Sequence, residues 1–291
     1  GVTAISDAND LKILLTTGET KLSARDSLSV IGVVSGALAA SSTGAITQFG
    51  ALKLTGATTL SGASVTLANP ANEFVGLVTV TAGATAISDV SDLNVSLTTG
   101  ETKLTTGGAL SLSGVVSGTL TASSTGAISQ FGALKVTGST ALNGASVVLA
   151  DTTNDFSGLV TVTAGVTAIS DANDLKIALT TGETKLTTGS ALSVSGVASG
   201  ALTVSSTGSI TQFGALKVAG ATALTGASVS MADPANDFSG QVTVTAGATA
   251  ISDANDLKVL LTTGETKLSA RDSLSVSGVV SGALTASSTG A

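Results

Sequence analysis

Carboxylate and amide side chains gather in one short motif, and they are the residues of this sequence best suited to chemistry. Ala232-Asp-Pro-Ala-Asn-Asp237 is followed 19 residues later by the related segment Ser252-Asp-Ala-Asn-Asp256. If both segments are turns in successive layers of one fold, Asp237 lies one layer from Asp256, and Asp233 lies near Asp253. Two carboxylates about 4.8 Å apart repel by about 1 kcal/mol in water. A calcium ion prefers several oxygen ligands and would remove that repulsion.

A purely structural interpretation of these turns stays open beside the calcium interpretation. Stacked Asn side chains would then cap the turns through amide ladders, while the Asp side chains point into solvent. The same pairing recurs as Asp155 with Asp174 and as Glu73 with Asp92. No segment matches the glycine-rich nonapeptide of calcium-binding β-rolls. We therefore assign no catalytic, cofactor-binding or metal-ligating residue and expect no cofactor.

Two further sets of residues recur at fixed positions. Glu101 and Lys103 are two residues apart on a predicted strand, so we expect a solvated pair on one face, worth a fraction of a kcal/mol. Its copies are Glu19 with Lys21, Glu183 with Lys185, and Glu265 with Lys267. The six Phe residues are Phe49, Phe74, Phe131, Phe156, Phe213 and Phe238. We expect them to fill wider layers of the interior, with a binding role for exposed Phe as the alternative.

These motifs recur because the whole chain is repetitive. Thr-Ala-Ile-Ser-Asp begins at Thr3, Thr85, Thr167 and Thr249, which is an interval of 82 residues each time. The repeats are 3–84, 85–166, 167–248 and the partial copy 249–291. This periodicity predicts one continuous repeat array over 1–291 rather than separate globular domains. Both ends fall inside a repeat, so we expect a slice of a longer array.

Apolar and small polar residues alternate at period two within each repeat, as in Leu77-Val-Thr-Val-Thr81 and Leu110-Ser-Leu-Ser-Gly114. Such alternation over five to seven residues is typical of short strands with one face inward. The 19-residue spacing between the two acidic motifs indicates four coils per repeat, each with three short strands. The sequence thus predicts an all-β, right-handed parallel β-helix (solenoid) of about 14 coils of roughly 20 residues. Three coils of about 27 residues per repeat fit this 19-residue spacing less well.

The alternative architecture is a tandem of 82-residue β-sandwich domains. The absence of Trp, Tyr and Cys and the presence of only two prolines argue against it. Charged residues make up only 11% of the chain and the net charge is −7. These values disfavour nucleic acid and anionic lipid as partners, because both require clustered Lys and Arg. No apolar run is long enough for a membrane-spanning helix.

An enzyme with this fold would need paired carboxylates and, for sugars, aromatic platforms. The chain lacks His, Tyr and Trp, and its acidic residues repeat with the scaffold. We therefore predict that it is not an enzyme. An ice-binding face would require Thr-x-Thr in every coil, whereas Thr79-Val-Thr81 occurs once in its repeat.

Three segments resemble the β-strand repeats of very large secreted bacterial exoproteins, the filamentous-haemagglutinin-like adhesins and autotransporter passengers. They are Asn154-Asp-Phe-Ser-Gly-Leu-Val-Thr-Val-Thr-Ala-Gly165, the Ile-Ser-Asp-Ala-Asn-Asp-Leu turn, and Gly200-Ala-Leu-Thr-Val-Ser-Ser-Thr-Gly-Ser-Ile-Thr-Gln212. The resemblance implies a right-handed β-helix, export through the outer membrane, and a stalk or fibre at the cell surface. Its motifs specify a scaffold rather than an activity.

The sequence therefore predicts a structural, extracellular rod or filament-forming repeat at the bacterial cell surface. The alternative is an adhesin module that binds host or neighbouring cells through loops. We expect self-association, end to end through open strand edges or side by side through faces of low charge. Cell-surface or matrix partners stay open, and we expect neither nucleic-acid binding nor membrane insertion.

Overall fold

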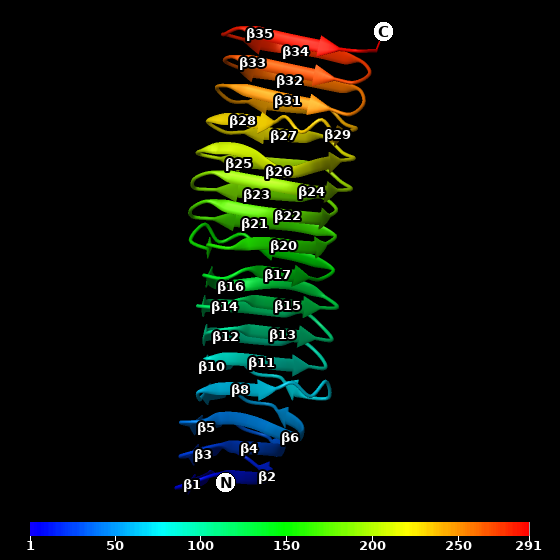
Figure 1. Cartoon of the computed structure of the whole chain (residues 1–291). Coiled ribbons are helices and arrows are strands. Elements are labelled where there is room, and N and C mark those ends of the chain that lie inside the picture. Colours follow the sequence, from blue (N-terminus) through cyan, green and yellow to red (C-terminus); the bar gives the residue numbers. More distant parts are fainter. Residues whose placement is uncertain (291) are drawn as a thin grey trace. The chain divides into compact units, whose positions relative to one another are not determined.

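A computed structural model describes residues 1–290, which belong to two compact units, Gly1–Ala145 and Ser146–Ala291. In each unit the chain winds through short parallel strands that stack one above the next (Figure 1). The described residues contain no helix, and thus none that is long and apolar enough to cross a membrane. The predicted all-β parallel solenoid is confirmed. The continuity of the array over 1–291 stays a prediction.

The first unit consists of two stacks of parallel strands that face each other across the core. Sheet A contains β1 (Thr3–Asp7), β3 (Thr20–Ala24), β5 (Leu38–Ser42), β7 (Thr58–Ser61), β10 (Val78–Ala82), β12 (Leu93–Thr99), β14 (Leu110–Val116) and β16 (Ala127–Val136). Sheet B contains β2 (Leu11–Thr17), β4 (Leu28–Val34), β6 (Ala45–Leu54), β8 (Ser64–Leu67), β9 (Glu73–Phe74), β11 (Ala84–Asp89), β13 (Thr102–Thr106), β15 (Leu120–Ser124) and β17 (Thr140–Asn143).

The second unit has the same construction. Its sheet A contains β18 (Ser146–Leu149), β19 (Asp155–Phe156), β21 (Val166–Asp171), β23 (Thr184–Thr188), β25 (Leu202–Ser206), β27 (Thr222–Thr225), β30 (Val242–Thr245), β32 (Leu257–Thr263) and β34 (Leu274–Val280). Its sheet B contains β20 (Leu159–Ala164), β22 (Leu175–Thr181), β24 (Leu192–Ala198), β26 (Ser209–Val218), β28 (Ser228–Met231), β29 (Asp237–Phe238), β31 (Thr249–Asp253), β33 (Thr266–Ala270) and β35 (Leu284–Ser288).

Each coil contains two strands, not the three that the sequence analysis predicts. The winding is also tighter, with about 16 turns of about 18 residues instead of 14 coils of 20. The ladder register explains the difference, because Thr3 pairs with Thr20 and Thr85 with Thr102, while Leu38 pairs with Thr58. Coil length thus varies along the repeat, and an offset of 19 residues occurs only in places, as where Ala45 of β6 pairs with Ser64 of β8.

The 82-residue repeat corresponds to nine half-turns, because β8 and β9 are consecutive strands of the same sheet and both pair with β6. An odd number of half-turns moves each new copy to the opposite side. The motif Thr-Ala-Ile-Ser-Asp accordingly forms β1 in sheet A and β11 in sheet B. In the second unit its copies form β21 in sheet A and β31 in sheet B. The two faces of each unit thus carry the same sequence pattern, displaced along the stack.

The core lies between the two sheets and is built from the alternation seen in the sequence. Leu22, Leu104 and Leu186 are fully buried, as are most inward-facing Val and Ile residues. Each fully buried aliphatic side chain contributes about 1.5–3 kcal/mol relative to exposure. Outward-facing positions are mostly Ser, Thr and Ala, which suit extended backbone or occupy little space. Burial of aliphatic side chains and the parallel ladders hold the fold together.

A bulge in the long strand of each repeat breaks the alternation. Val30 pairs with Gln48 and Gly32 with Leu52, so Phe49–Ala51 stands opposite a single residue. Gly32 has φ +123°, and a Cβ there would lie 2.0 Å from the carbonyl oxygen of Leu15. Only glycine accepts both this backbone conformation and this close approach. The repeat therefore requires glycine at this position, and Gly114, Gly196 and Gly278 are its copies.

Candidate functional site

The loop between the two short strands β28 and β29 is organised by a fully buried asparagine. Asn236 is 0% exposed, although it lies in the acidic motif. Its amide donates to the carbonyl of Met231 at 3.0 Å and to Oε1 of Gln212 at 2.9 Å. Its Oδ1 accepts from Nε2 of Gln212 at 2.9 Å and from the backbone N–H of Leu216 at 2.8 Å. Asn236 and Gln212 thus bond each other twice.

The same arrangement holds the corresponding loop in the first unit. Asn72 is also 0% exposed. Its amide donates to Oε1 of Gln48 and to the carbonyl of Leu67, both at 2.9 Å. Gln48 and the N–H of Leu52 donate back to Asn72 Oδ1 at 2.8 and 2.9 Å. Because an unbonded buried amide is costly, this closed network fixes one loop conformation.

A buried aspartate caps the turn in the next coil. Asp253 is 4% exposed. Its Oδ2 accepts the backbone N–H of Phe238 at 2.8 Å, and its Oδ1 accepts the N–H of Asn255 at 2.7 Å. Asp171 makes the same two bonds, to Phe156 and Asn173. Both carboxylate oxygens therefore satisfy backbone donors, which ties the short strand β29 to the following coil.

The carboxyl groups of this turn have pKa values shifted in opposite directions. Burial raises the pKa of Asp253, and the charges of Asp237 and Asp256 add to the rise, although two backbone N–H groups oppose it. The side-chain hydroxyl and backbone N–H of Ser273 lower the pKa of Asp256. They donate to its Oδ1 at 2.7 and 2.9 Å. Ionisation of the buried Asp253 is therefore opposed by desolvation, whereas ionisation of the exposed Asp256 is favoured by its hydrogen bonds.

The predicted stacking of the acidic residues is realised only in part. Asp237 and Asp256 both lie close enough to Asp253 to influence it, but the ladder partner of Asp237 is Lys217, not Asp256. Asp233 is half-buried and closes its own turn by accepting the N–H of Ala235 at 2.9 Å. The described residues contain no group of three or more acidic side chains placed to hold a metal ion.

The amide-ladder interpretation of the turns also needs correction. Asn236 is buried and bonds to Gln212, whereas its counterpart 19 residues later, Asn255, is only half-buried. Asp253 points inward rather than into solvent. The reason is that the two motifs occupy different places in the coil, since one follows β28 and the other follows β31. Sequence similarity alone does not separate these two environments.

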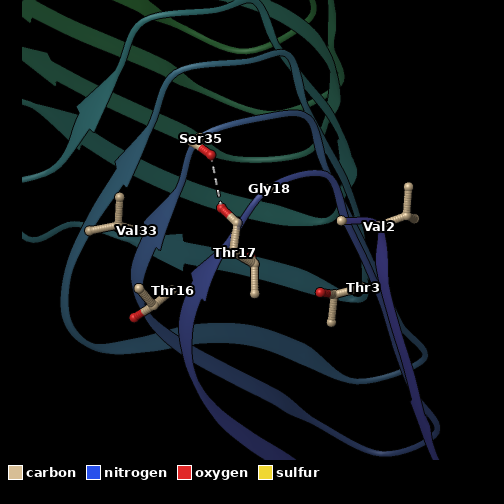
Figure 2. A pocket seen from close by; sticks show the side chains of 8 residues that line it. Val2, Thr3, Thr16, Thr17, Gly18, Val33 and Ser35 are labelled. Carbon is tan, nitrogen blue, oxygen red and sulfur yellow. Dashed lines mark hydrogen bonds between the residues drawn. The ribbon is translucent and has the colours of Figure 1, made fainter.

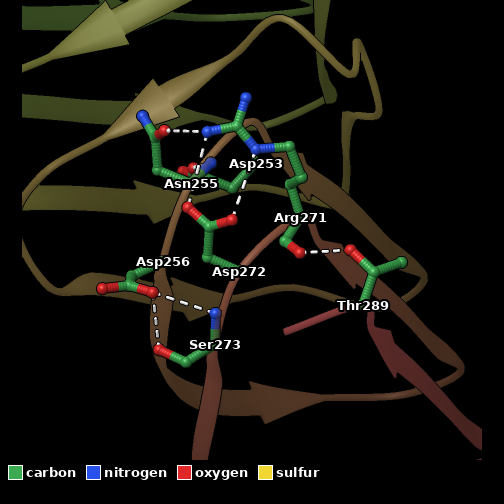
Figure 3. A network of polar contacts seen from close by, with 7 residues as sticks. All are labelled: Asp253, Asn255, Asp256, Arg271, Asp272, Ser273 and Thr289. Atoms are coloured by element: carbon green, nitrogen blue, oxygen red, sulfur yellow. Dashed lines mark hydrogen bonds and ion pairs between the residues drawn. The ribbon is translucent and has the colours of Figure 1, made fainter. Parts of the chain in front are cut away.

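Arginine stabilises the second of these turns from outside (Figure 3). Arg271 donates through Nη2 to Asn255 Oδ1 at 2.9 Å and forms an ion pair with Asp272 at 3.3 Å. Its carbonyl accepts the hydroxyl of Thr289. Because the ion pair is exposed, it contributes at most about 1 kcal/mol. We infer a local structural role for Arg271.

The six Phe residues divide into two classes, so the prediction that all of them fill the interior is half wrong. Phe74, Phe156 and Phe238 are buried, at 1% exposure, as expected. Phe49, Phe131 and Phe213 are 44%, 52% and 41% exposed. They stand in the bulges, where the chain has extra residues and the alternation fails. Nζ of Lys12 lies 4.5 Å from the ring centroid of Phe49, and Nζ of Lys176 lies 4.7 Å from that of Phe213.

The predicted Glu–Lys pairs are realised only in part. Glu101 lies in the turn before β13 and Lys103 within that strand, both exposed, and no ion pair joins them among the described residues. An ion pair does link Lys53 Nζ to Glu73 at 3.5 Å across the β6–β9 ladder. Thr102 between them is buried, so Glu101 and Lys103 share one solvated face, as predicted, without an ion pair.

Open hollows on the surface are lined mainly by small residues and hydroxyls. One of about 470 Å³ lies among Gly1, Val2, Thr3, Thr16, Thr17, Gly18, Val33 and Ser35 (Figure 2). Within it the Ser35 hydroxyl donates to the carbonyl of Thr17 at 3.2 Å. Smaller hollows recur beside Lys21, Lys185 and Lys267, where the strand motif Thr-Ala-Ile-Ser leaves space. The hydroxyls and the single Lys in each hollow can offer hydrogen bonds and one positive charge, and the hollow beside Lys267 also has the carboxylate of Glu265.

Comparison with known proteins gives a family but no activity. Residues 17–81, 99–163 and 181–245 match the family described as repeats of unknown function (DUF5649). The chain belongs to this family. The three DUF5649 matches begin 82 residues apart, which agrees with the repeat read from the sequence. No curated protein matches the chain, and no solved structure does.

Proposed function

We propose that this chain of DUF5649 repeats is a structural spacer, an extracellular β-solenoid segment of a bacterial cell-surface or secreted protein. The observation that supports this proposal is the use of the polar residues. Asn236, Gln212 and both oxygens of Asp253 are occupied by bonds that hold the coil together. These groups recur with the scaffold in every full repeat, as a structural role requires.

The proposal that the chain is not an enzyme rests on the same use of side chains. A general acid–base pair needs titratable groups that can reach a substrate. Asp253, whose pKa burial raises, faces the N–H groups of Phe238 and Asn255 instead. The hollows beside Lys21 and Lys185 are lined by hydroxyl and apolar groups with a single basic side chain each, and the hollow beside Lys267 adds one carboxylate, that of Glu265. We propose spacing, not catalysis, as the role of the repeat.

The extracellular location draws on the resemblance to large secreted exoproteins and on composition. A chain without cysteine that is held together by buried aliphatic residues needs no disulfide or cofactor to fold. Its neutral surface of Ser, Thr and Ala fits exposure outside a cell. Protease treatment of intact producing cells tests the location. Loss of the repeat from intact cells supports it, whereas loss only after lysis refutes it.

A spacer is defined by its length, and the length of this chain can be changed by deleting whole repeats. One repeat of nine half-turns adds about 22 Å at 4.8 Å per coil. In the exported parent protein, deleting residues 85–166 should shorten the distance between the flanking segments by about this amount and leave export intact. Electron microscopy with a label on each side measures the distance. An unchanged distance would contradict a spacer role.

An adhesin module is the second candidate. It is favoured by the loops that join consecutive short strands of the same sheet, such as β8 and β9. Residues 68–72 leave the regular coil between β8 and β9, and their copies 150–154 and 232–236 differ in sequence. Pro70 and Ala71 are exposed at the tip of the first of these loops. Substituting the loop tips tests this candidate. Reduced binding of the purified chain to cells would support adhesion over pure spacing.

A further inference from the structure

The outer faces of the first unit carry an apolar ridge that a structural coil does not need. On sheet B, Leu14 of β2, Val33 of β4 and Phe49 of β6 are 70%, 44% and 44% exposed. They lie on neighbouring strands, since β2 pairs with β4 and β4 with β6. Half-buried Ile31 lies among them, opposite Leu14 in the ladder. We call these four residues the sheet B ridge.

The opposite face at the same coils is flat. Sheet A presents Ala39 and Ser41 of β5 and Thr59 and Ser61 of β7, all exposed. These residues are in register, because Ala39 pairs with Thr59 and Ser41 with Ser61. We call them the sheet A flat. These four side chains are small and leave room for a neighbouring ridge, and exposed Lys21 of β3, the ladder partner of Ala39, lies at their edge.

Farther along the same unit the ridge lies on sheet A and the flat on sheet B, because each repeat has an odd number of half-turns. Sheet A there carries a smaller copy of the ridge, with exposed Val115 on β14 and Phe131 on β16, whereas Ser96 and Ser113 occupy the positions of Leu14 and Ile31. Sheet B carries the copy of the flat, with Thr121 of β15 and Ala141 of β17. Each face thus has one ridge and one flat, and each ridge has a flat behind it.

We propose that a second copy of this chain docks side by side, face to face, with sheet B of one copy on sheet A of the next. Without any shift along the stack, Phe49 of β6 is then level with the sheet A flat on β5 and β7 of its neighbour, and Leu14 of β2 is level with β1 and β3. Farther along, the ridge at Phe131 meets the flat at Ala141. Since the two contacting faces differ, the contact is heterologous and can propagate to further copies. This inference rests on the proposed structural role and names its partner.

The area and charge of the faces support this occupant. Eight sheet A strands at about 4.8 Å spacing and about 17 Å length give roughly 650 Å², near the 800 Å² per partner of a stable interface. The acidic residues lie mainly in turns, whereas the faces of the first unit carry scattered Lys residues. Interface cores are depleted in charge, and the cation beside the sheet B ridge, Lys12, lies over the ring of Phe49 with its Nζ 4.5 Å from the centroid. The net charge of −7 opposes association at low salt, so salt should strengthen it.

The test measures self-association of the full chain by sedimentation over a range of concentrations and salt. The wild-type mass should rise above 27.7 kDa with concentration and rise further at high salt. The double variant F49K/F131K should weaken association by about tenfold or more. The matched control V75K/V90K adds the same charge at exposed Val residues in turns and should leave association unchanged.

Complementary substitutions test the pairing of the faces. A39E places a carboxylate on the sheet A flat, opposite the position of Phe49 in the neighbour. A39E alone and F49K alone should each associate less, and a mixture should recover. Equal loss in V75K/V90K and F49K/F131K, failure of the mixture to recover, or a monomeric wild type at all concentrations would overturn the inference. A monomer that still spaces labels correctly would leave the proposed function intact, so the two failures are distinguishable.

Discussion

Replacing Asn236 with Ala gives the sharpest test of how the coil is held together. The substitution removes the acceptor of the Leu216 N–H and the donor to the Met231 carbonyl, and both backbone groups lie in the buried network. Each unsatisfied buried polar group costs about 1–3 kcal/mol. Gln212 is half-buried and can bond to water, so we leave its two bonds out. The expected loss is about 4 kcal/mol, the middle of the range for two groups.

Local hydrogen exchange is the appropriate assay, because solenoids open in parts and one unfolding midpoint does not describe them. A loss of about 4 kcal/mol raises the exchange rate of protected amides in β26 and β28 by roughly 10³-fold. Asn255→Ala is the matched control. Asn255 occupies the corresponding position of the next motif, and its side chain accepts only from exposed Arg271. If N236A and N255A raise exchange equally, the buried network does not hold the loop.

Three other substitutions test the backbone, a buried hydroxyl and the carboxyl groups. Gly196→Ala should destabilise the fold by about 3 kcal/mol or more, because φ at Gly196 is +108° and an added Cβ would lie 2.2 Å from the carbonyl oxygen of Leu179. Gly214→Ala is the control in hydrogen-exchange experiments, because a Cβ there would lie 3.6 Å from the nearest atom, Cβ of Ser195. Thr222→Val should stabilise by about 1 kcal/mol, because the buried Thr222 hydroxyl has no partner. Thr184→Val should instead destabilise, because it breaks the 2.7 Å bond to Thr181, and local hydrogen exchange compares the two variants. Asp256→Asn should destabilise at pH 7, and the difference should shrink as the pH falls below 3.8, because the lowered pKa of Asp256 means that its ionised form stabilises the fold above that pH. Burial raises the pKa of Asp253, so the protonated form of this group favours the fold. Its contribution to the stability of the fold is therefore fully present below pH 3.8 and is lost as the pH rises through the folded-state pKa, which is the opposite pH dependence to that of Asp256. If local hydrogen exchange gives the same free-energy difference between Asp256→Asn and the parent at pH 3 as at pH 7, this assignment is contradicted.

The fold class follows from the sequence because its signals are local and repeated. Alternation at period two specifies strands, and the exact 82-residue recurrence specifies a solenoid rather than unrelated domains. The number of strands in a coil does not follow, because it depends on where the tight turns allow the chain to reverse. The pairing of Thr3 with Thr20 but Leu38 with Thr58 shows that coil length varies along the repeat. A single average spacing conceals that variation.

The candidate site was predictable in its residue types but not in its geometry. Asp253 and Asn236 are recognisable as turn residues, yet their burial depends on a partner far away in sequence. Gln212, which bonds Asn236, lies 24 residues earlier in a strand whose bulge turns its side chain toward the loop. The only sequence signal for it is the recurrence of Gln-Phe-Gly at the same repeat position, and this does not reveal its partner. The exposed Phe213 in that bulge was misjudged for the same reason.

The nine half-turns of the repeat set a rule of parity for how such proteins can change length. Gaining or losing one copy turns everything beyond it to the other side, whereas gaining or losing two copies restores the original orientation. Lineages in which a distal segment must point in a given direction should therefore vary their arrays by even numbers of copies, and a tally of copy numbers among related chains would reveal that bias.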